Sequence, residues 1–258
     1  SRNISNMYYF TSDVHLGAGD ETFSRRTEQR FVKWLDKVAE DADAIFLVGD
    51  IFDFWFEYHR VIPKGFVRVL GKLAEITDRG TPIYFFIGNH DIWCKRYLTE
   101  ECGVIMHYEP MTIDIEGKLF YLAHGDGLGD PDKKFQFLRK VFHNPFLQWL
   151  FAGIPTRWGL GFGLEWAKHS RLKHEKEGAP RYMGEQNEPL IIYSKEYLKR
   201  HPDINYFIYG HRHIELDLML TRDARLLILG EWINLCTYAV FDGENLRMEN
   251  FIEGETVP

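Results

Sequence analysis

The chain has 258 residues, of which 45% are hydrophobic, and its 31 basic and 38 acidic residues give a net charge of −7. This size fits one large domain, or one domain with a sizeable insertion, and the negative charge speaks against a nucleic-acid-binding protein. Three cysteines predict a reducing compartment rather than a disulfide framework. The first residues lack the order of a signal peptide, and no stretch reaches the ~18 to 20 apolar residues of a membrane span, so we expect a cytoplasmic protein.

The first ninety residues alternate between apolar runs and amphipathic stretches. Strands are expected over residues 7–12, 44–48 and 83–87, with helices over residues 26–39 and 64–76 between them. This alternation favours a sheet with parallel neighbours and helices packed on it.

After residue 100 the pattern is mainly strand-like, with turn signals between several of the runs. Seven strands are expected, over residues 111–115, 119–123, 204–209, 216–220, 225–229, 237–241 and 246–251. We therefore predict that the second half is mostly antiparallel sheet. Two facing sheets with helices outside are the simplest way to bury both sets of strands, so the predicted fold is α/β, a four-layer αββα sandwich.

A helical insertion over residues 132–184 is predicted to interrupt a core made of residues 1–131 and 185–258. Between residues 133 and 176 it holds nine Lys or Arg, two Glu and nine aromatic residues. A basic, aromatic-rich stretch inside an acidic protein indicates a unit with its own task.

Three helices are expected in this insertion. Asp132 is a good N-cap for the first, and Asn144-Pro145 supplies a cap and a proline at the first position of the second. Residues 159–163, Gly-Leu-Gly-Phe-Gly, are expected to form a flexible joint before the third helix.

Five short polar clusters each follow an apolar, strand-like run, and so each is expected where a strand ends. They are Asp13-Val14-His15, Gly49-Asp50, Gly88-Asn89-His90-Asp91, Ala123-His124-Gly125-Asp126 and Gly210-His211-Arg212-His213. Taken singly, the first cluster is more often a loop aspartate with a surface histidine, and the second is more often a turn. An isolated histidine is also more often structural than a ligand. All five together favour a site with two metal ions, because such a site needs carboxylate, amide and imidazole ligands and a carboxylate that bridges the ions.

The cluster that begins at Gly88 is the most specific of the five, and Asn89, His90 and Asp91 are the candidate catalytic residues. The Asn89 side chain offers a neutral carbonyl oxygen to an ion. His90 can donate a proton or contact a phosphate, and Asp91 can hold the tautomer of its imidazole.

In this order, the clusters resemble the calcineurin-like metallophosphoesterase superfamily. The resemblance implies hydrolysis by a hydroxide activated between two divalent ions that share Asp50. One ion would be held by Asp13, His15, Asp50 and His213, and the other by Asp50, Asn89, His124 and His211.

The insertion is similar to the lid of LpxH-type UDP-diacylglucosamine pyrophosphatases of lipid A synthesis. The similarity rests on Leu138-Arg139-Lys140, Asn144 to Gln148, Leu150-Phe151 and Ile154-Pro155, and extends to Asp50 to Trp55. It implies a lid that clasps acyl chains, UMP and diacylglucosamine 1-phosphate (lipid X) as products, Mn²⁺ as the metal, and work at the inner face of the cytoplasmic membrane. The candidate substrate-binding residues are Asp132, Phe135, Arg139, Phe142, Trp149, Ser170 and His174.

The composition of the lid agrees with such a glycolipid, because metals and basic groups suit a diphosphate and aromatic side chains suit acyl chains. A basic amphipathic surface would also rest on anionic lipid. No nucleic acid and no obligate protein partner is expected. The alternative is that the lid aromatics only pack the lid onto the sandwich.

Two other functions stay open. The LpxH pattern usually has Arg at the position of His90, whereas general phosphoesterases have His there. His90 therefore favours a phosphodiesterase or phosphatase acting on another nucleotide or lipid phosphoester. A binding or scaffold protein that had lost catalysis would usually have lost ligands, and all seven candidate ligands are present.

Overall fold

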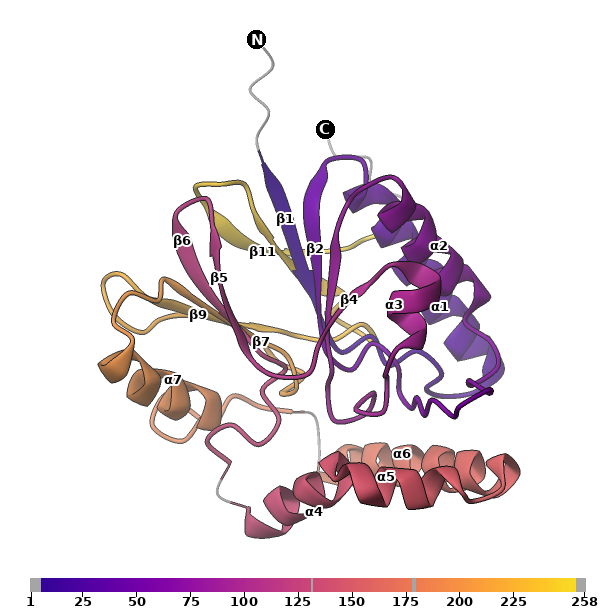
Figure 1. Cartoon of the computed structure of the whole chain (residues 1–258). Coiled ribbons are helices and arrows are strands. Elements are labelled where there is room, and N and C mark those ends of the chain that lie inside the picture. Colours follow the sequence, from indigo (N-terminus) through magenta and orange to yellow (C-terminus); the bar gives the residue numbers. More distant parts are fainter. Residues whose placement is uncertain (1–5, 131, 178–179, 254–258) are drawn as a thin grey trace.

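The computed structural model describes residues 6–130, 132–177 and 180–253, with only the backbone for residues 169–177. Two sheets face each other, helices cover both outer faces, and the insertion lies along one edge of the sandwich (Figure 1). This is the predicted αββα arrangement.

The first sheet has six strands in the order β11-β10-β1-β2-β3-β4. As predicted, β1, β2 and β3 run parallel, and the short strand β4, which the sequence analysis missed, continues them. The antiparallel strands β10 and β11 complete the sheet. Its strands are β1 Met7–Thr11, β2 Ala42–Val48, β3 Ile83–Phe86, β4 Ile105–His107, β10 Thr237–Phe241 and β11 Leu246–Asn250.

The second sheet corrects the expectation of a mostly antiparallel second half. Its order is β5-β6-β7-β9-β8, and the central strands β6, β7 and β9 are parallel, with antiparallel partners only at the edges. The chain leaves β6 through the insertion and a helix before it returns as β7, and such a long crossover permits a parallel neighbour. The strands are β5 Met111–Ile115, β6 Lys118–Leu122, β7 Tyr206–Tyr209, β8 Glu215–Met219 and β9 Arg225–Leu229.

Helices α1 (Glu21–Val38), α2 (Val67–Asp78) and α3 (Tyr97–Cys102) pack on the outer face of the first sheet, and α7 (Pro189–Arg200) packs on the second. Helix α1 begins before the predicted start because Asp20 caps it. The sequence analysis missed α3 and α7. Between the sheets, the Phe10 ring stacks on Phe46 and Phe120, with centroids 4.8 and 5.5 Å away.

The insertion consists of α4 (Lys133–His143), α5 (Pro145–Ala152) and α6 (Thr156–Glu177). Both predicted N-caps are confirmed, since Asp132 and Asn144 each accept hydrogen bonds from two backbone amides of the following helix. The expected joint over residues 159–163 is wrong, because α6 runs through it. Two of its three glycines, Gly159 and Gly163, serve close packing: a Cβ on Gly163, for example, would overlap the Phe54 ring.

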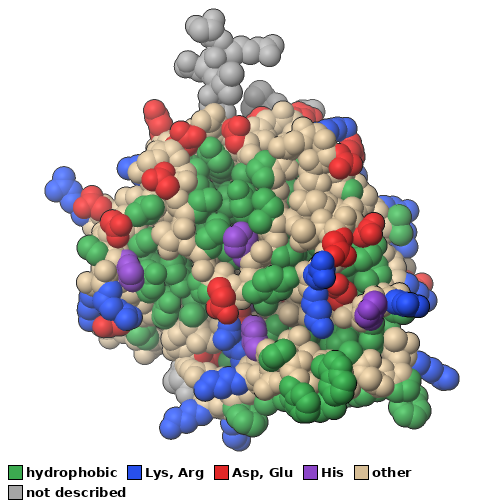
Figure 2. Space-filling model, in the orientation of Figure 1, with side chains coloured by type: hydrophobic (Ala, Val, Ile, Leu, Met, Phe, Trp, Pro, Cys, Tyr) green, Lys and Arg blue, Asp and Glu red, His purple; other side chains and the backbone are tan. Residues whose placement is uncertain are grey.

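The aromatic side chains of the insertion divide between a face that packs on the core and a face that is exposed. Phe142 and Phe151 pack against Trp93 of the core, with ring centroids 5.3 and 6.0 Å away. Figure 2 shows hydrophobic side chains and Lys or Arg together along the edge of the molecule where the insertion lies.

Two further features concern the described part of the chain in general. None of its helices combines the length and the apolar composition that a membrane span needs. Its three cysteines are buried and unpaired.

Candidate metal centre

The five polar clusters meet at one edge of the sandwich. Each comes directly after a parallel strand, and parallel strands of one sheet end on the same side. Asp13 follows β1, Asp50 follows β2, Asn89 follows β3, His124 follows β6, and His211 with His213 follows β7. The fold therefore brings all seven candidate ligands to the edge that the lid borders (Figure 1).

The backbone here is unusual for residues other than glycine. Five of the seven candidate ligands have φ between 51° and 68°, in the left-handed region: Asp13, His15, Asp50, His211 and His213. Each such residue costs about 1–3 kcal/mol, and strain of this kind gathers at functional sites. A Cβ on Gly88 or Gly210 would overlap the Asp50 or Asp13 carboxylate, so both glycines are required for the close approach.

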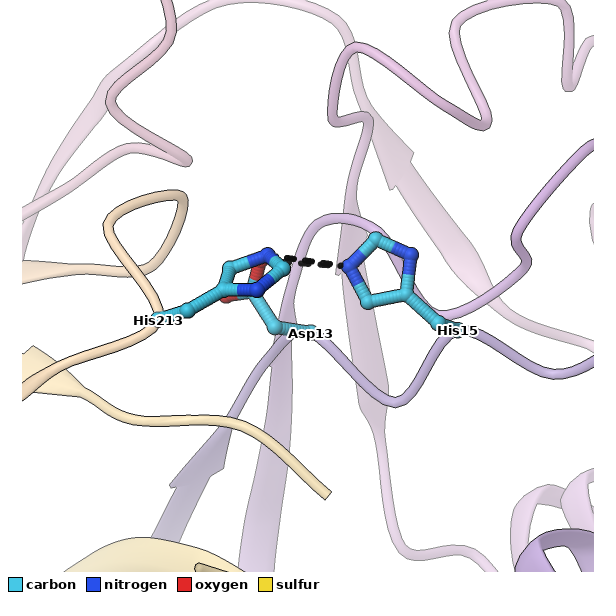
Figure 3. A group of neighbouring side chains, drawn as sticks. All are labelled: Asp13, His15 and His213. Carbon is cyan, nitrogen blue, oxygen red and sulfur yellow. Dashed lines mark hydrogen bonds and ion pairs between the residues drawn. The ribbon is translucent and has the colours of Figure 1, made fainter. Parts of the chain in front are cut away.

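Asp13, His15 and His213 form a first group (Figure 3). The Asp13 carboxylate is held by its Oδ2, which accepts hydrogen bonds from Ser12 Oγ at 2.6 Å and from the His211 backbone amide at 2.9 Å. Its Oδ1 is buried, has no hydrogen-bond partner among the described residues, and lies 3.2 Å from His213 Nε2. The ring nitrogens His15 Nε2 and His213 Nε2 face each other at 3.1 Å. An unsatisfied oxygen and two facing imidazole nitrogens are the contacts that a cation between them would satisfy.

Asp53, which the sequence analysis did not single out, orients the first group. Its Oδ1 lies 3.2 Å from His15 Nδ1, so the His15 ring donates there and turns the lone pair of Nε2 toward Asp13. The signal was present in the sequence, because Asp53 lies within the Asp50 to Trp55 run that resembles the LpxH type.

Asn89, His124 and His211 form a second group. Asn89 Oδ1 lies 3.0 Å from His211 Nδ1 and 3.3 Å from His124 Nε2. The His124 ring donates from Nδ1 to the Val48 carbonyl oxygen at 2.9 Å, which leaves Nε2 without a proton when the ring is neutral. The amide oxygen and the two imidazoles therefore converge on one point.

Asp50 lies between the two groups. Its Oδ1 accepts the His90 backbone amide at 2.9 Å. Its Oδ2 lies 3.2 Å from His124 Nε2 and 3.9 Å from His15 Nε2. One buried carboxylate oxygen thus faces a ligand candidate of each group, as a bridging ligand must.

The charges of the buried groups fit cation binding. Burial raises the pKa of Asp50, but the neighbouring His124 and His90 hold that pKa well below its usual range. Burial likewise raises the pKa of Asp13, but the imidazoles of His15 and His213 beside the carboxylate hold that pKa well below its usual value. Two ionised carboxylates inside the protein need positive charge close by. The donor set of carboxylates, imidazoles and one amide suits a divalent transition metal.

The predicted partnership of His90 and Asp91 is wrong in its geometry. His90 Nδ1 lies 2.8 Å from the Asp53 carbonyl oxygen, which fixes the tautomer instead. The Asp91 carboxylate accepts the backbone amides of Gly88 and Ile51 at 2.6 and 2.8 Å. The loop turns after His90, so that Asp91 fastens the two ligand-bearing loops to each other.

The predicted substrate-binding residues occupy different settings. Asp132 caps α4, and the Phe135 ring lies 6.1 Å from that of His211. Arg139 Nε donates to Asp126 Oδ2 at 2.6 Å, which ties α4 to the loop after His124. Phe142 packs against the core, and Trp149 is 68% exposed. The side chains of Ser170 and His174 lie outside the described part of the structure.

The sequence model of the calcineurin-like phosphoesterase family matches residues 8–215 of this chain. The chain belongs to the calcineurin-like phosphoesterase family. The matched part of this phosphoesterase holds all seven candidate ligands and the helices α4, α5 and α6 of the insertion.

This phosphoesterase is also similar to two curated proteins named UDP-2,3-diacylglucosamine hydrolase. The protein from Porphyromonas gingivalis is 40% identical over 257 residues, covering 96% of this chain and 98% of that protein. The protein from Actinobacillus succinogenes is 29% identical, covering 87% of this chain and 91% of that protein. Among solved structures, YfcE, a phosphoesterase from E. coli, is similar at 14% identity with a TM-score of 0.43, covering 93% of this chain and 90% of that one.

Proposed function

We propose that this phosphoesterase hydrolyses the pyrophosphate bond of UDP-2,3-diacylglucosamine, giving UMP and 2,3-diacylglucosamine 1-phosphate in lipid A biosynthesis. The observation that carries the proposal is the 40% identity, over nearly the full length of both chains, to a protein named for that substrate. The convergence of seven candidate ligands at one edge of the sandwich supports hydrolysis that depends on metal ions.

Two divalent ions, assigned as Mn²⁺, are the proposed cofactor. The first group, Asp13, His15 and His213, would hold one ion and the second group, Asn89, His124 and His211, the other, with Asp50 shared between them. When bound, such ions activate water for attack and neutralise charge on the phosphoryl oxygens. The mixture of oxygen and imidazole ligands fits Mn²⁺ but also other transition metals, so the identity of the metal is part of the proposal.

The protein's own residues would orient the reaction and move protons. His15 and His124 present Nε2 to the site because their Nδ1 atoms donate to Asp53 and to Val48. His90 donates from Nδ1 to the Asp53 carbonyl oxygen, so its Nε2 is the atom that would exchange a proton with the leaving group. Burial lowers the pKa of His90 to about 4, and an anionic diphosphate beside the ring would raise it again.

The insertion, assigned to residues 132–184, would act as the lid over the glycolipid and rest on the cytoplasmic face of the inner membrane. Its outward surface supports this, because large apolar side chains stand there more than half exposed, among Lys and Arg. They are Phe137, Phe146, Trp149, Trp158, Phe162 and Leu164. An apolar surface of this kind with basic neighbours suits an anionic lipid surface.

A second candidate function is hydrolysis of another nucleotide or lipid phosphoester. It is favoured by His90, since an imidazole can protonate a leaving group and the Arg usual in the LpxH pattern cannot. Activity that ignored the acyl chains of the substrate would support it.

The test is release of UMP from UDP-diacylglucosamine by the purified protein with Mn²⁺. Asp50→Asn is the matched variant, because it keeps the shape of the side chain and removes the charge that both groups share. We expect robust release by the wild type and none by the variant, together with a lower metal content. If the wild type released no UMP but hydrolysed bis(4-nitrophenyl) phosphate well, the assignment as a phosphoesterase would stand and the glycolipid would be rejected as its substrate.

A further inference from the structure

Helix α6 sits on the core through a face made of its smallest residues. Gly159, Gly163 and Ala167 follow one another at intervals of four and therefore share one side of the helix. All three are buried. A Cβ on Gly163 would overlap the Phe54 ring, and a Cβ on Gly159 would overlap the Tyr58 hydroxyl. Close contact with the core thus requires glycine at both positions.

The core side of this contact is an apolar platform, which comprises Phe54, Phe56, Tyr58 and Trp93. The Phe56 ring lies 4.6 Å from Tyr58 and 5.6 Å from Trp93 between centroids. Ala167 of α6 belongs to the same buried cluster. We call the contact of Gly159, Gly163 and Ala167 with this platform the seat of α6. Burial of apolar surface holds α6 in its seat, and another apolar group of similar width could bury the same platform in place of α6.

The seat leaves one polar atom unsatisfied. Tyr58 is 8% exposed, and its hydroxyl has no hydrogen-bond partner among the described residues although it points at Gly159. A buried hydroxyl without a partner is unfavourable, and water would satisfy it if α6 moved away. The closed seat is thus opposed by a specific group.

The same helix covers the candidate acid. The Trp166 ring lies 5.7 Å from the His90 ring and 5.3 Å from Phe142 between centroids. His90 is only 6% exposed in this arrangement. Trp166, which is adjacent to Ala167 on α6, is therefore one of the side chains that enclose His90.

We propose that α6 is a reversible cover: seated on the platform, it closes His90, and an acyl chain of the substrate opens the site by taking its place against Phe54 and Tyr58. The proposal rests on the proposed function for the identity of the displacing ligand. The cover links recognition of the apolar part of a substrate to access to the reacting phosphate. It would hold back hydrolysis of phosphodiesters that lack an acyl chain.

The test compares Gly163→Ala with Gly161→Ala in the full chain loaded with Mn²⁺, using bis(4-nitrophenyl) phosphate as the small substrate. Both substitutions bring the same gain in helix propensity, but a Cβ on Gly161 meets nothing within 4 Å. We expect Gly163→Ala to raise kcat/KM by about three- to tenfold, because the fraction of open protein rises, and Gly161→Ala to leave it unchanged. Hydrogen exchange of the backbone amides over residues 156–168 should be faster in Gly163→Ala only.

An amphiphile provides an independent arm. A single-chain dodecyl detergent below its critical micelle concentration should accelerate the wild type on the small substrate and leave Gly163→Ala, already open, unaffected. Equal rates and equal exchange in the two glycine variants would overturn the proposal. If Gly163→Ala does not fold, Trp166→Ala replaces it: a raised rate on the small substrate supports the cover, and a wild-type rate overturns it.

Failure of the cover and failure of the proposed function give different results. If the wild type releases UMP and the two glycine variants do not differ, the glycolipid substrate stands and the proposal that α6 is a cover fails. Faster hydrolysis by Gly163→Ala without UMP release by the wild type keeps the cover and assigns it to another apolar substrate.

Discussion

The buried carboxylate of Asp53 lies 3.2 Å from Nδ1 of His15, and the Asp53 backbone carbonyl oxygen lies 2.8 Å from Nδ1 of His90. One residue therefore sets the tautomer of a candidate metal ligand and of the candidate acid. Partners of this kind hold a ligand ring in place and raise its basicity.

Replacing Asp53 should weaken metal binding without removing a ligand. We expect Asp53→Ala to lower the affinity for Mn²⁺ about 10- to 100-fold, which is typical of groups that orient metal ligands. Asp53→Asn should lose less, since its amide oxygen can still accept the His15 proton. Titration of the chelated protein with Mn²⁺ measures both. Wild-type affinity in Asp53→Ala would show that His15 needs no partner.

Removal of divalent ions should destabilise the fold as well as stop catalysis. The ionised carboxylates of Asp13 and Asp50 are buried, and a cation between them would offset their desolvation. At a Mn²⁺ concentration of 100 times Kd, bound Mn²⁺ should add about 2.7 kcal/mol to the free energy of unfolding. The measurement is the rise in Tm when Mn²⁺ is added to protein that was stripped with a chelator and then dialysed. Asp50→Asn should show little or no rise in Tm. If the Tm of the wild type did not change on addition of Mn²⁺, the proposed metal centre would be contradicted.

The stability of the metal-free protein should fall in weak acid because of His90. Burial lowers the pKa of His90 to about 4, below the ordinary value of 6.5. The unfolded chain therefore binds the proton at higher pH than the folded chain, and stability is fully present above pH 6.5 and is lost as the pH falls toward 4. Between pH 7 and 5 the wild type should lose about 2 kcal/mol more than His90→Gln in urea unfolding. If the free energy of unfolding of the two proteins changed with pH in parallel, protonation of His90 would not be the cause of the loss of stability.

Much of the fold follows from local patterns. The strands at residues 225–229 and 237–241 were predicted residue for residue, because continuous apolar runs bounded by polar turns indicate buried strands. The helix starts at Asp132 and Asn144 were predicted from capping chemistry alone. The convergence of the seven candidate ligands followed from their places after strands.

What the sequence did not reveal depends on contacts between distant residues. Glycines at 159–163 lower helix propensity, yet the packing of α6 on Phe54 and Tyr58 decides their conformation. Asp91 is next to His90 in the chain, but its carboxylate turns to the amides of a loop forty residues earlier, such as Ile51. The parallel pairing of β6 with β7 depends on a crossover of more than eighty residues, and no local pattern encodes it.

Phe142 and Trp149 should respond differently to substitution, although the sequence grouped them as contacts of the acyl chains. Phe142 is half-buried and packs against Trp93 and Trp166, whereas Trp149 is 68% exposed. Phe142→Ala should lower the free energy of unfolding by about 1–3 kcal/mol, less than a fully buried Phe would lose, and raise KM for the glycolipid. Trp149→Ala should leave Tm unchanged.

The effect of Trp149→Ala should instead appear at a lipid surface. An exposed indole beside basic side chains contributes to binding at the interface of a bilayer, so the variant should sediment less with vesicles that contain anionic lipid. Val67→Ala is the control, because Val67 is 75% exposed on α2, away from the lid. Equal sedimentation of the two variants, with a raised KM only for Trp149→Ala, would mean that the outward face contacts the substrate itself. Unchanged sedimentation and unchanged KM would remove this face from lipid recognition altogether.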